Sequence, residues 1–145
     1  MRAITLLFLL LGSTFALANP PVETGTFNNK AIYGYDTVAY WTESKAVKGA
    51  DDIVFTWRGA EWHFSSEENK ALFESDPEKY APQYGGYCAF GLANDKLVSI
   101  DEDAFHIYNG KLYLNYNKKV AARFKEDIDY FIAEADKNYP KKVDL

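Results

Sequence analysis

The stretch FHIYNGKLYLNY (105–116) decides the fold of this chain, because it carries the clearest β-hairpin signal in the sequence. Apolar and aromatic residues lie on both sides of Asn109-Gly110, and Asn-Gly is the preferred pair for a two-residue type I′ turn. Upstream, IVFTW (53–57) and EWHF (61–64) flank a short turn. These two segments predict a second antiparallel hairpin.

Helix signals lie between and after the hairpins. Ser65 and Ser66 are candidate N-caps of a short central helix, and Asp76-Pro77 is typical of the start of another helical turn. Apolar residues then recur at helical spacing from about Asn117 to Asn138. They predict one long C-terminal helix, which Tyr139-Pro140 should end.

The remaining segments complete the predicted fold. AIYGYDTVAYW (31–41) is expected to form two short strands around a turn. Gly85 and Gly86 precede Cys88 and favour an irregular segment in which backbones approach closely. The order of elements predicts an α+β fold: a small single domain of antiparallel β-hairpins with a short central helix and a long C-terminal helix packed on the sheet.

Composition limits the classes of function. The chain has 145 residues, 26% of them charged and 17% aromatic, with a formal net charge of −5. This length and balance are typical of one globular domain. Because nucleic-acid binders usually present a basic surface, the acidic charge argues against a nucleic-acid partner.

The first eighteen residues read as an export signal. Met1-Arg2 begins the chain, an apolar run from Ile4 to Leu11 follows, and Ala16-Leu17-Ala18 is a small-x-small cleavage site. We therefore expect a signal peptide at 1–18, cleavage after Ala18, and a periplasmic or secreted protein with no further transmembrane segment. The mature chain should comprise a flexible lead-in (19–30), the folded domain (31–140) and a short tail (141–145).

Three side chains are candidates for metal chemistry. Cys88 is the sole cysteine, so it has no disulfide partner within the chain, and His63 and His106 are the two histidines. A thiolate and an imidazole suit copper, and the same pair is the minimum for an activated thiol. The alternative is that Cys88 is a buried core residue and that the histidines belong to the polar faces of strands.

Other chemical signals are weaker. No hydrolase, nucleotide-binding or structural zinc motif is present, which favours a protein without catalytic residues over an enzyme. Of the carboxylates, Asp36 stands alone, whereas Asp101-Glu102-Asp103 lacks the spacing of a calcium loop and is expected to be a solvated turn. Four aromatic residues near the start of the domain belong either to the core or to a cleft: Tyr33, Tyr35, Tyr40 and Trp41.

Three longer segments resemble the YHS domain family, particularly its exported single-domain branch, often called YHS domain-containing (seleno)proteins. They are GYDTVAYW (34–41), WRGAEWHFSSEENKALFESDPEKYAPQYGGYCAFG (57–91) and NGKLYLNY (109–116). The resemblance runs from about Ala31 to Pro140.

The resemblance implies a soluble domain with a link to metal. YHS domains accompany copper-transporting ATPases and some hydroxylases, in which two family cysteines are associated with metal binding. One lies in an Asp-Pro-Val-Cys stretch and the other in a Phe-Cys-Ser stretch. In this sequence Ala39 and Ser65 stand at those two positions, whereas Cys88 belongs to the YGGYCAFG pattern of the exported branch.

Three functional hypotheses remain. The first is a non-enzymatic binding module that handles copper, with Cys88 as the anchoring ligand, His63 or His106 as a second one, and a partner protein supplying more. The second is a thiol-redox protein in which an external thiol resolves oxidised Cys88, which requires a lowered thiol pKa. The third is an interaction module that uses an aromatic surface, with Cys88 merely packed.

Overall fold

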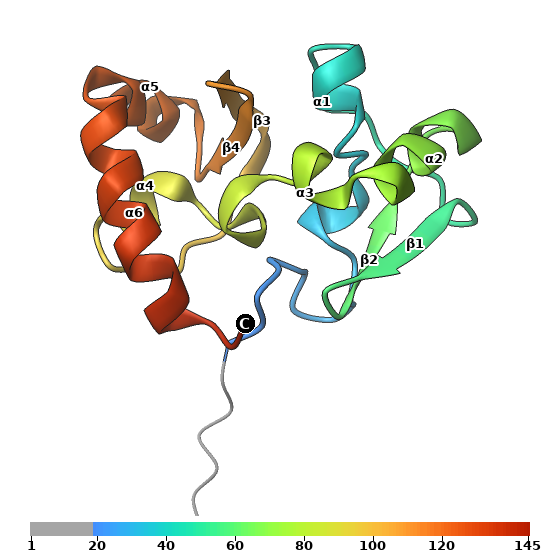
Figure 1. Cartoon of the computed structure of the whole chain (residues 1–145), viewed down its shortest axis with the longest axis horizontal. Helices are drawn as coiled ribbons and strands as arrows, with labels where there is room; N and C mark the ends of the chain where they lie inside the picture. The colour runs from blue at the N-terminus through green and yellow to red at the C-terminus, as the bar shows by residue number, and fades with distance from the viewer. Residues whose placement is uncertain (1–18) are drawn as a thin grey trace, which may run out of the picture.

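The computed structural model describes residues 19–145. The predicted signal peptide (1–18) lies outside the described residues, so the structure does not test it. Within 19–145, no helix has both the length and the apolar character needed to cross a membrane. The described chain forms two lobes joined by a central segment (Figure 1).

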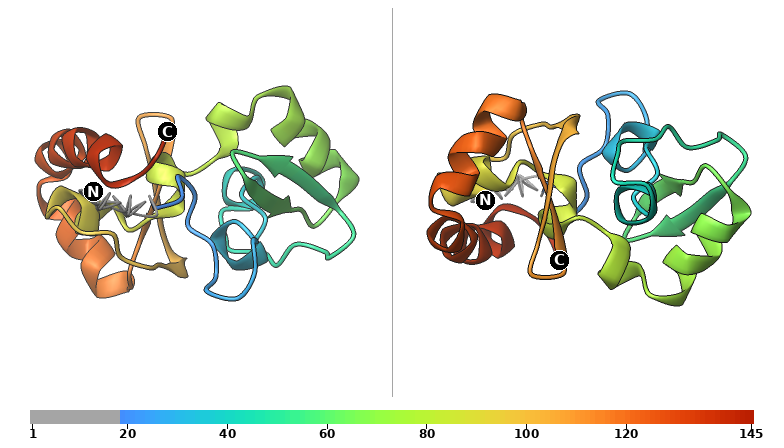
Figure 2. Two further views of the ribbon diagram at one scale, coloured as in Figure 1. Left: turned by 90° about the horizontal axis from the view of Figure 1, so that it is seen from below. Right: turned by 90° about the horizontal axis from the view of Figure 1, so that it is seen from above.

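The amino-terminal lobe, residues 31–80, is built on the first predicted hairpin. Strands β1 (Val54–Trp57) and β2 (Ala60–His63) pair antiparallel. Helices α1 (Ala39–Thr42), α2 (Glu67–Ser75) and α3 (Pro77–Tyr80) lie around this hairpin (Figure 2). Aromatic rings fill the space between β2 and α2, where the Trp62 and Phe73 centroids are 5.1 Å apart. Burial of such large rings is a main source of stability in this lobe.

The helix starts predicted in this lobe are confirmed. The Ser66 hydroxyl accepts the Asn69 N–H and caps α2, and the Asp76 side chain accepts the Lys79 N–H and caps α3. Pro77 occupies the first turn of α3, where its missing N–H has no helical partner to lose.

The prediction of two strands within 31–41 is wrong. This segment forms a 3-10 turn, η1 (Ile32–Gly34), followed by the short helix α1. Tyr33 has a φ of 60°, which no strand residue adopts. The Asp36 carboxylate accepts the N–H groups of Val38 and Ala39, which starts a helix in place of the second strand.

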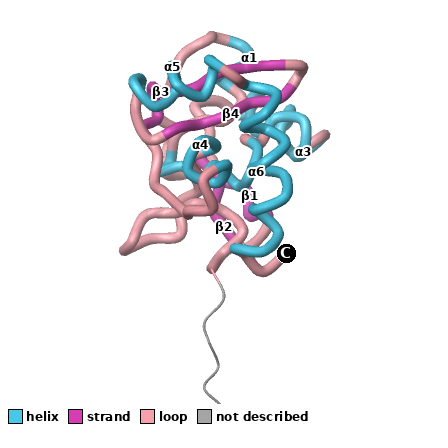
Figure 3. Tube along the Cα trace, turned by 90° about the vertical axis from the view of Figure 1, so that its left-hand side faces the viewer, coloured by secondary structure: helices cyan, strands magenta, loops and turns pink. Residues whose placement is uncertain are grey.

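The carboxy-terminal lobe, residues 88–143, contains the second hairpin. Strands β3 (Asp101–Tyr108) and β4 (Lys111–Asn115) pair antiparallel around Asn109-Gly110. Asn109 and Gly110 have φ values of 49° and 70°, as a type I′ turn requires, so the predicted hairpin is confirmed. The short helix α4 (Ala89–Ala93) lies beside it (Figure 3).

The long C-terminal helical segment is present but divided. It consists of α5 (Lys118–Glu126), which packs on the β3–β4 hairpin, and α6 (Ile128–Lys142), which packs on α4. Asp127 separates them with a non-helical backbone, φ −145° and ψ 62°. Pro140 does not end α6, which continues to Lys142. The following Val143 is buried and bridges to Asn19.

The segment η2 (Gln83–Gly86) connects the lobes. Tyr84, Gly85 and Gly86 have φ values of 61°, 62° and 89°, so three consecutive residues adopt left-handed conformations. The Glu23 N–H donates to the Gly85 carbonyl, and a Cβ on Gly85 would overlap the carbonyl of Pro21. Residues 21–23 thus lie against η2, with Val22 buried beside it, whereas residues 26–29 are exposed.

We expect Gly85→Ala to lower the free energy of unfolding by more than about 3 kcal/mol, because it combines a left-handed conformation with a backbone overlap. The matched control is Gly59→Ala. Gly59 has a φ of 74° but open space around the added methyl group, so its cost should be about 1 kcal/mol. Urea unfolding measures both. Equal losses would contradict the close packing of residues 21–23 on Gly85.

Candidate functional site

Cys88 lies where three elements of the carboxy-terminal lobe meet. It follows η2, caps the N-terminus of α4 and faces the end of β4. Its Sγ accepts the Gly91 N–H at 3.4 Å and the Tyr116 N–H at 3.2 Å. The thiol in turn donates to Oδ1 of Asn115 at 3.4 Å. The bonds with Tyr116 and Asn115 therefore hold the start of α4 against the end of β4.

The environment of the thiol favours its neutral form. Cys88 is 1% exposed, and burial raises its pKa above the ordinary value, although backbone N–H groups offset part of this effect. A reactive or metal-binding cysteine uses its thiolate, which a raised pKa disfavours. The lowered pKa that the thiol-redox hypothesis requires is not found.

Asn115 supports this cluster, and the sequence analysis did not identify it. Its side chain is fully buried, and its Oδ1 also accepts the Phe90 N–H at 3.0 Å. Its Nδ2 has no hydrogen-bond partner among residues 19–145. No local sequence signal marks Asn115, because its partners are 25 and 27 residues away along the chain.

A pocket of about 420 Å³ opens beside Cys88. We call it the Cys88 pocket; the lining residues that matter here are Cys88, Phe90, Val98, Val120, Lys96 and Arg123. The Arg123 guanidinium lies 5.6 Å from the centroid of the Phe90 ring. The pocket thus combines apolar walls with two cationic side chains.

His63 lies in the other lobe, buried at the end of β2. Its Nδ1 is 3.0 Å from the Ala50 carbonyl oxygen, and its ring nitrogens lie within 4 Å of the carboxylates of Asp51 and Glu61. Gly49 allows this packing, since a Cβ there would lie 2.6 Å from the His63 backbone. These contacts hold the His63 ring against residues of its own lobe.

His106 lies on β3, opposite Tyr113. Its ring stacks near Tyr108 with centroids 6.3 Å apart, and partial burial together with Lys125 lowers its pKa. No hydrogen bond joins Cys88, His63 and His106 in the described chain. Nor do residues 19–145 contain a group of three or more His, Cys, Asp or Glu side chains placed to hold a metal ion.

The aromatic residues near the start of the domain have mixed roles. Tyr40 is fully buried and its hydroxyl donates to the Glu102 carbonyl, while the Trp41 indole N–H donates to the Tyr80 carbonyl. Tyr33 and Tyr35 are partly exposed. Tyr40 and Trp41 therefore stabilise the fold, and Tyr33 and Tyr35 contribute to the surface.

Asp36 is the centre of the largest polar cluster in the amino-terminal lobe. It is fully buried; one carboxylate oxygen accepts the two N–H groups that start α1. The other accepts the Ser65 N–H and hydroxyl, at 2.8 and 2.7 Å, and the Asn69 amide at 2.8 Å. The carboxylate therefore fixes α1 against the start of α2.

We expect native Cys88 to react with iodoacetamide more than about tenfold more slowly than in urea-unfolded protein, because each unit of raised pKa removes tenfold of the thiolate. The rate should rise with pH to a midpoint above the usual thiol value of about 8.5. Intact mass measures the labelling. Rapid reaction with a midpoint below neutral pH would instead favour the thiol-redox hypothesis.

We expect Asp36→Asn to lower the free energy of unfolding by about 3 kcal/mol, because the amide nitrogen would face N–H and O–H donors on whichever side it lies. The control is Asp52→Asn on the exposed surface, which should change stability little. Urea unfolding compares the two variants. An unchanged midpoint for Asp36→Asn would show that the carboxylate does not hold α1 and α2 together.

The positions that resemble the family's metal-binding cysteines do not fit a soft metal here. Ala39 is buried without a donor side chain, and the Ser65 hydroxyl donates to Asp36. Carboxylate and hydroxyl oxygens are hard ligands, whereas Cu(I) prefers sulfur. We therefore assign no metal to this cluster.

Comparison with known proteins bears on the motifs of the amino-terminal lobe. No curated protein and no solved structure matches the chain. Residues 38–84, which run from α1 through the first hairpin to η2, match the family model described as the YHS domain. The chain therefore contains a YHS domain.

Proposed function

We propose that this chain is an exported, non-catalytic binding module whose ligand occupies the Cys88 pocket. The observation that carries this proposal is the pair of cationic side chains at an apolar pocket. Lys96 and Arg123 form no ion pair with any residue of 19–145, although the chain has a formal net charge of −5. Two cations placed together at an apolar pocket favour a ligand with an anionic group.

The shape and lining of the pocket indicate a small amphiphilic molecule. Its volume of about 420 Å³ lies within the usual range of about 300–1,000 Å³ for ligand sites. Phe90, Val98 and Val120 supply apolar contact for the body of the ligand, and Lys96 and Arg123 supply charge for its anionic group. In this arrangement Cys88 contributes to the pocket wall and holds α4 in place.

Copper binding through Cys88 has less support. YHS domains are associated with metal binding, and Cys88 lies at a pocket wall. However, the Cys88 pKa is raised, and neither His63 nor His106 contacts Cys88. One thiol binds Cu(I) weakly without further ligands, so a copper role would need a partner protein to supply them.

We expect the aromatic anion 1-anilinonaphthalene-8-sulfonate to bind the native protein with fluorescence enhancement. Arg123→Gln and Lys96→Gln should each weaken binding about tenfold, since a charge-assisted hydrogen bond contributes about 1.5–3 kcal/mol. Lys45→Gln is the matched control, because Lys45 is an exposed lysine of the other lobe. It should leave the affinity unchanged.

Two further measurements test whether the probe binds in the Cys88 pocket and through its sulfonate. N-phenyl-1-naphthylamine has the same aromatic body without the sulfonate, and its affinity should not depend on Arg123. Bound probe should also slow the labelling of Cys88. Equal binding by wild type and both charge variants would overturn the proposal. Cu(I) binding that Cys88→Ser abolishes, without competition from the probe, would favour the copper hypothesis.

A further inference from the structure

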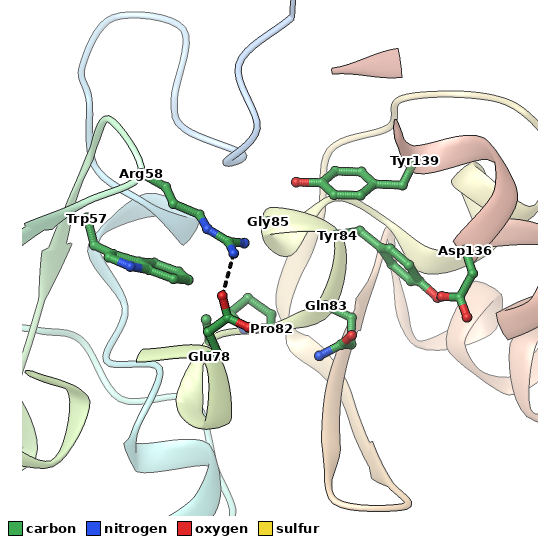
Figure 4. Close-up of a pocket in the computed structure, with 10 residues that line it drawn as sticks. Trp57, Arg58, Glu78, Pro82, Gln83, Tyr84, Gly85, Asp136 and Tyr139 are labelled. Carbon is green, nitrogen blue, oxygen red and sulfur yellow. Dashed lines mark hydrogen bonds and ion pairs between the residues drawn. The ribbon is translucent and has the colours of Figure 1, made fainter. Parts of the chain in front are cut away.

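A second cavity, of about 260 Å³, lies between the two lobes and shares no lining residue with the Cys88 pocket. We call it the interlobe cleft. Trp57, Arg58 and Glu78 lie on its amino-terminal side, and Tyr84, Asp136 and Tyr139 lie across from them (Figure 4). Gln83 and Gly85 of η2 complete it.

The amino-terminal side presents an aromatic ring beside a polar pair. The Arg58 guanidinium lies 4.3 Å from the centroid of the Trp57 ring and 2.7 Å from the Glu78 carboxylate. The Arg58 and Glu78 side chains are 43% and 74% exposed. Exposed ion pairs are weak, so a ligand that hydrogen-bonds to both groups can reorganise this one at low cost.

The opposite side presents two aromatic rings and a carboxylate. The centroids of the Tyr84 and Tyr139 rings are 5.7 Å apart, and the Tyr84 hydroxyl donates to Oδ1 of Asp136 at 2.8 Å. Burial and Asp136 raise the pKa of Tyr84, so its hydroxyl stays protonated. The other oxygen of Asp136 can accept further hydrogen bonds, and the Gln83 amide can both donate and accept.

The cleft carries charges of both signs, so a simple ion of either sign meets repulsion as well as attraction. A cation would meet Arg58, and an anion would meet Glu78 and Asp136. A neutral ligand with several hydroxyl groups avoids both repulsions. Each hydroxyl donates to a carboxylate or accepts from guanidinium and amide groups, which are the polar groups present.

We propose that the interlobe cleft binds a neutral sugar ring, either as a monosaccharide or as one unit of a glycan. The half-buried rings of Trp57 and Tyr139 offer apolar surface for the C–H face of the sugar ring, and Arg58, Glu78, Gln83 and Asp136 offer hydrogen bonds to its hydroxyls. A volume below the usual range for ligand pockets fits one ring rather than an extended chain.

The test is an NMR titration that follows the Trp57 indole N–H, since Trp57 is the cleft's tryptophan. The probes are the methyl glycosides of glucose, galactose, mannose and N-acetylglucosamine, each up to about 50 mM, which reveals even a millimolar Kd. We expect at least one glycoside to shift this resonance in a saturable way. Sugar should not displace 1-anilinonaphthalene-8-sulfonate, so this result is independent of the proposed function.

Variants distinguish the cleft from other surfaces. Glu78→Gln and Gln83→Ala should each weaken sugar binding about fivefold to tenfold. Glu74→Gln is the matched control, because Glu74 lies on α2 and pairs with Lys70 outside the cleft. A Trp57 resonance unmoved by all four glycosides would overturn the proposal. So would a saturable shift by lysine or acetate that the glycosides do not produce.

Discussion

The backbone of residues 21–23 lies directly against Gly85, in the segment that joins the two lobes. The contact needs both a missing side chain and a left-handed backbone at Gly85. The chain enters η2 from α3 of one lobe and leaves it toward α4 of the other. The turn directs Tyr84 into the interlobe cleft and, a few residues later, places Cys88 at its own pocket. Both candidate sites therefore depend on the same backbone geometry.

The buried thiol of Cys88 has a structural role and, in the proposed function, also forms part of the pocket wall. Its sulfur accepts two backbone N–H groups and donates to Asn115, so it satisfies polar groups that would otherwise be buried without partners. Burial that keeps the thiol neutral also makes it a suitable apolar wall. The packing that buries this cysteine also shields it from oxidants and shapes the pocket.

The sequence predicted the elements whose energetics are local and missed those that depend on distant residues. The Asn109-Gly110 turn and the Ser66 cap act within a few residues, so they were predicted correctly. Helix α1 depends on Asp36, which Ser65 and Asn69 orient from 29 and 33 residues away. Cys88 stood out because it is the sole cysteine, but its pocket did not. Lys96 and Arg123 meet there only after the chain folds.

The Asp36 cluster lies where the family resemblance would place a metal. Ala39 and Ser65 occupy positions where the family resemblance places thiols, and the space between α1 and α2 is filled by a carboxylate whose two oxygens accept five hydrogen bonds. These bonds leave Asp36 little capacity to ligate an ion without breaking the contacts that hold α1. The network fixes α1 against α2, and the two cavities described above lie beside Cys88 and between the lobes. Both cavities thus lie away from the position where the family resemblance places a metal.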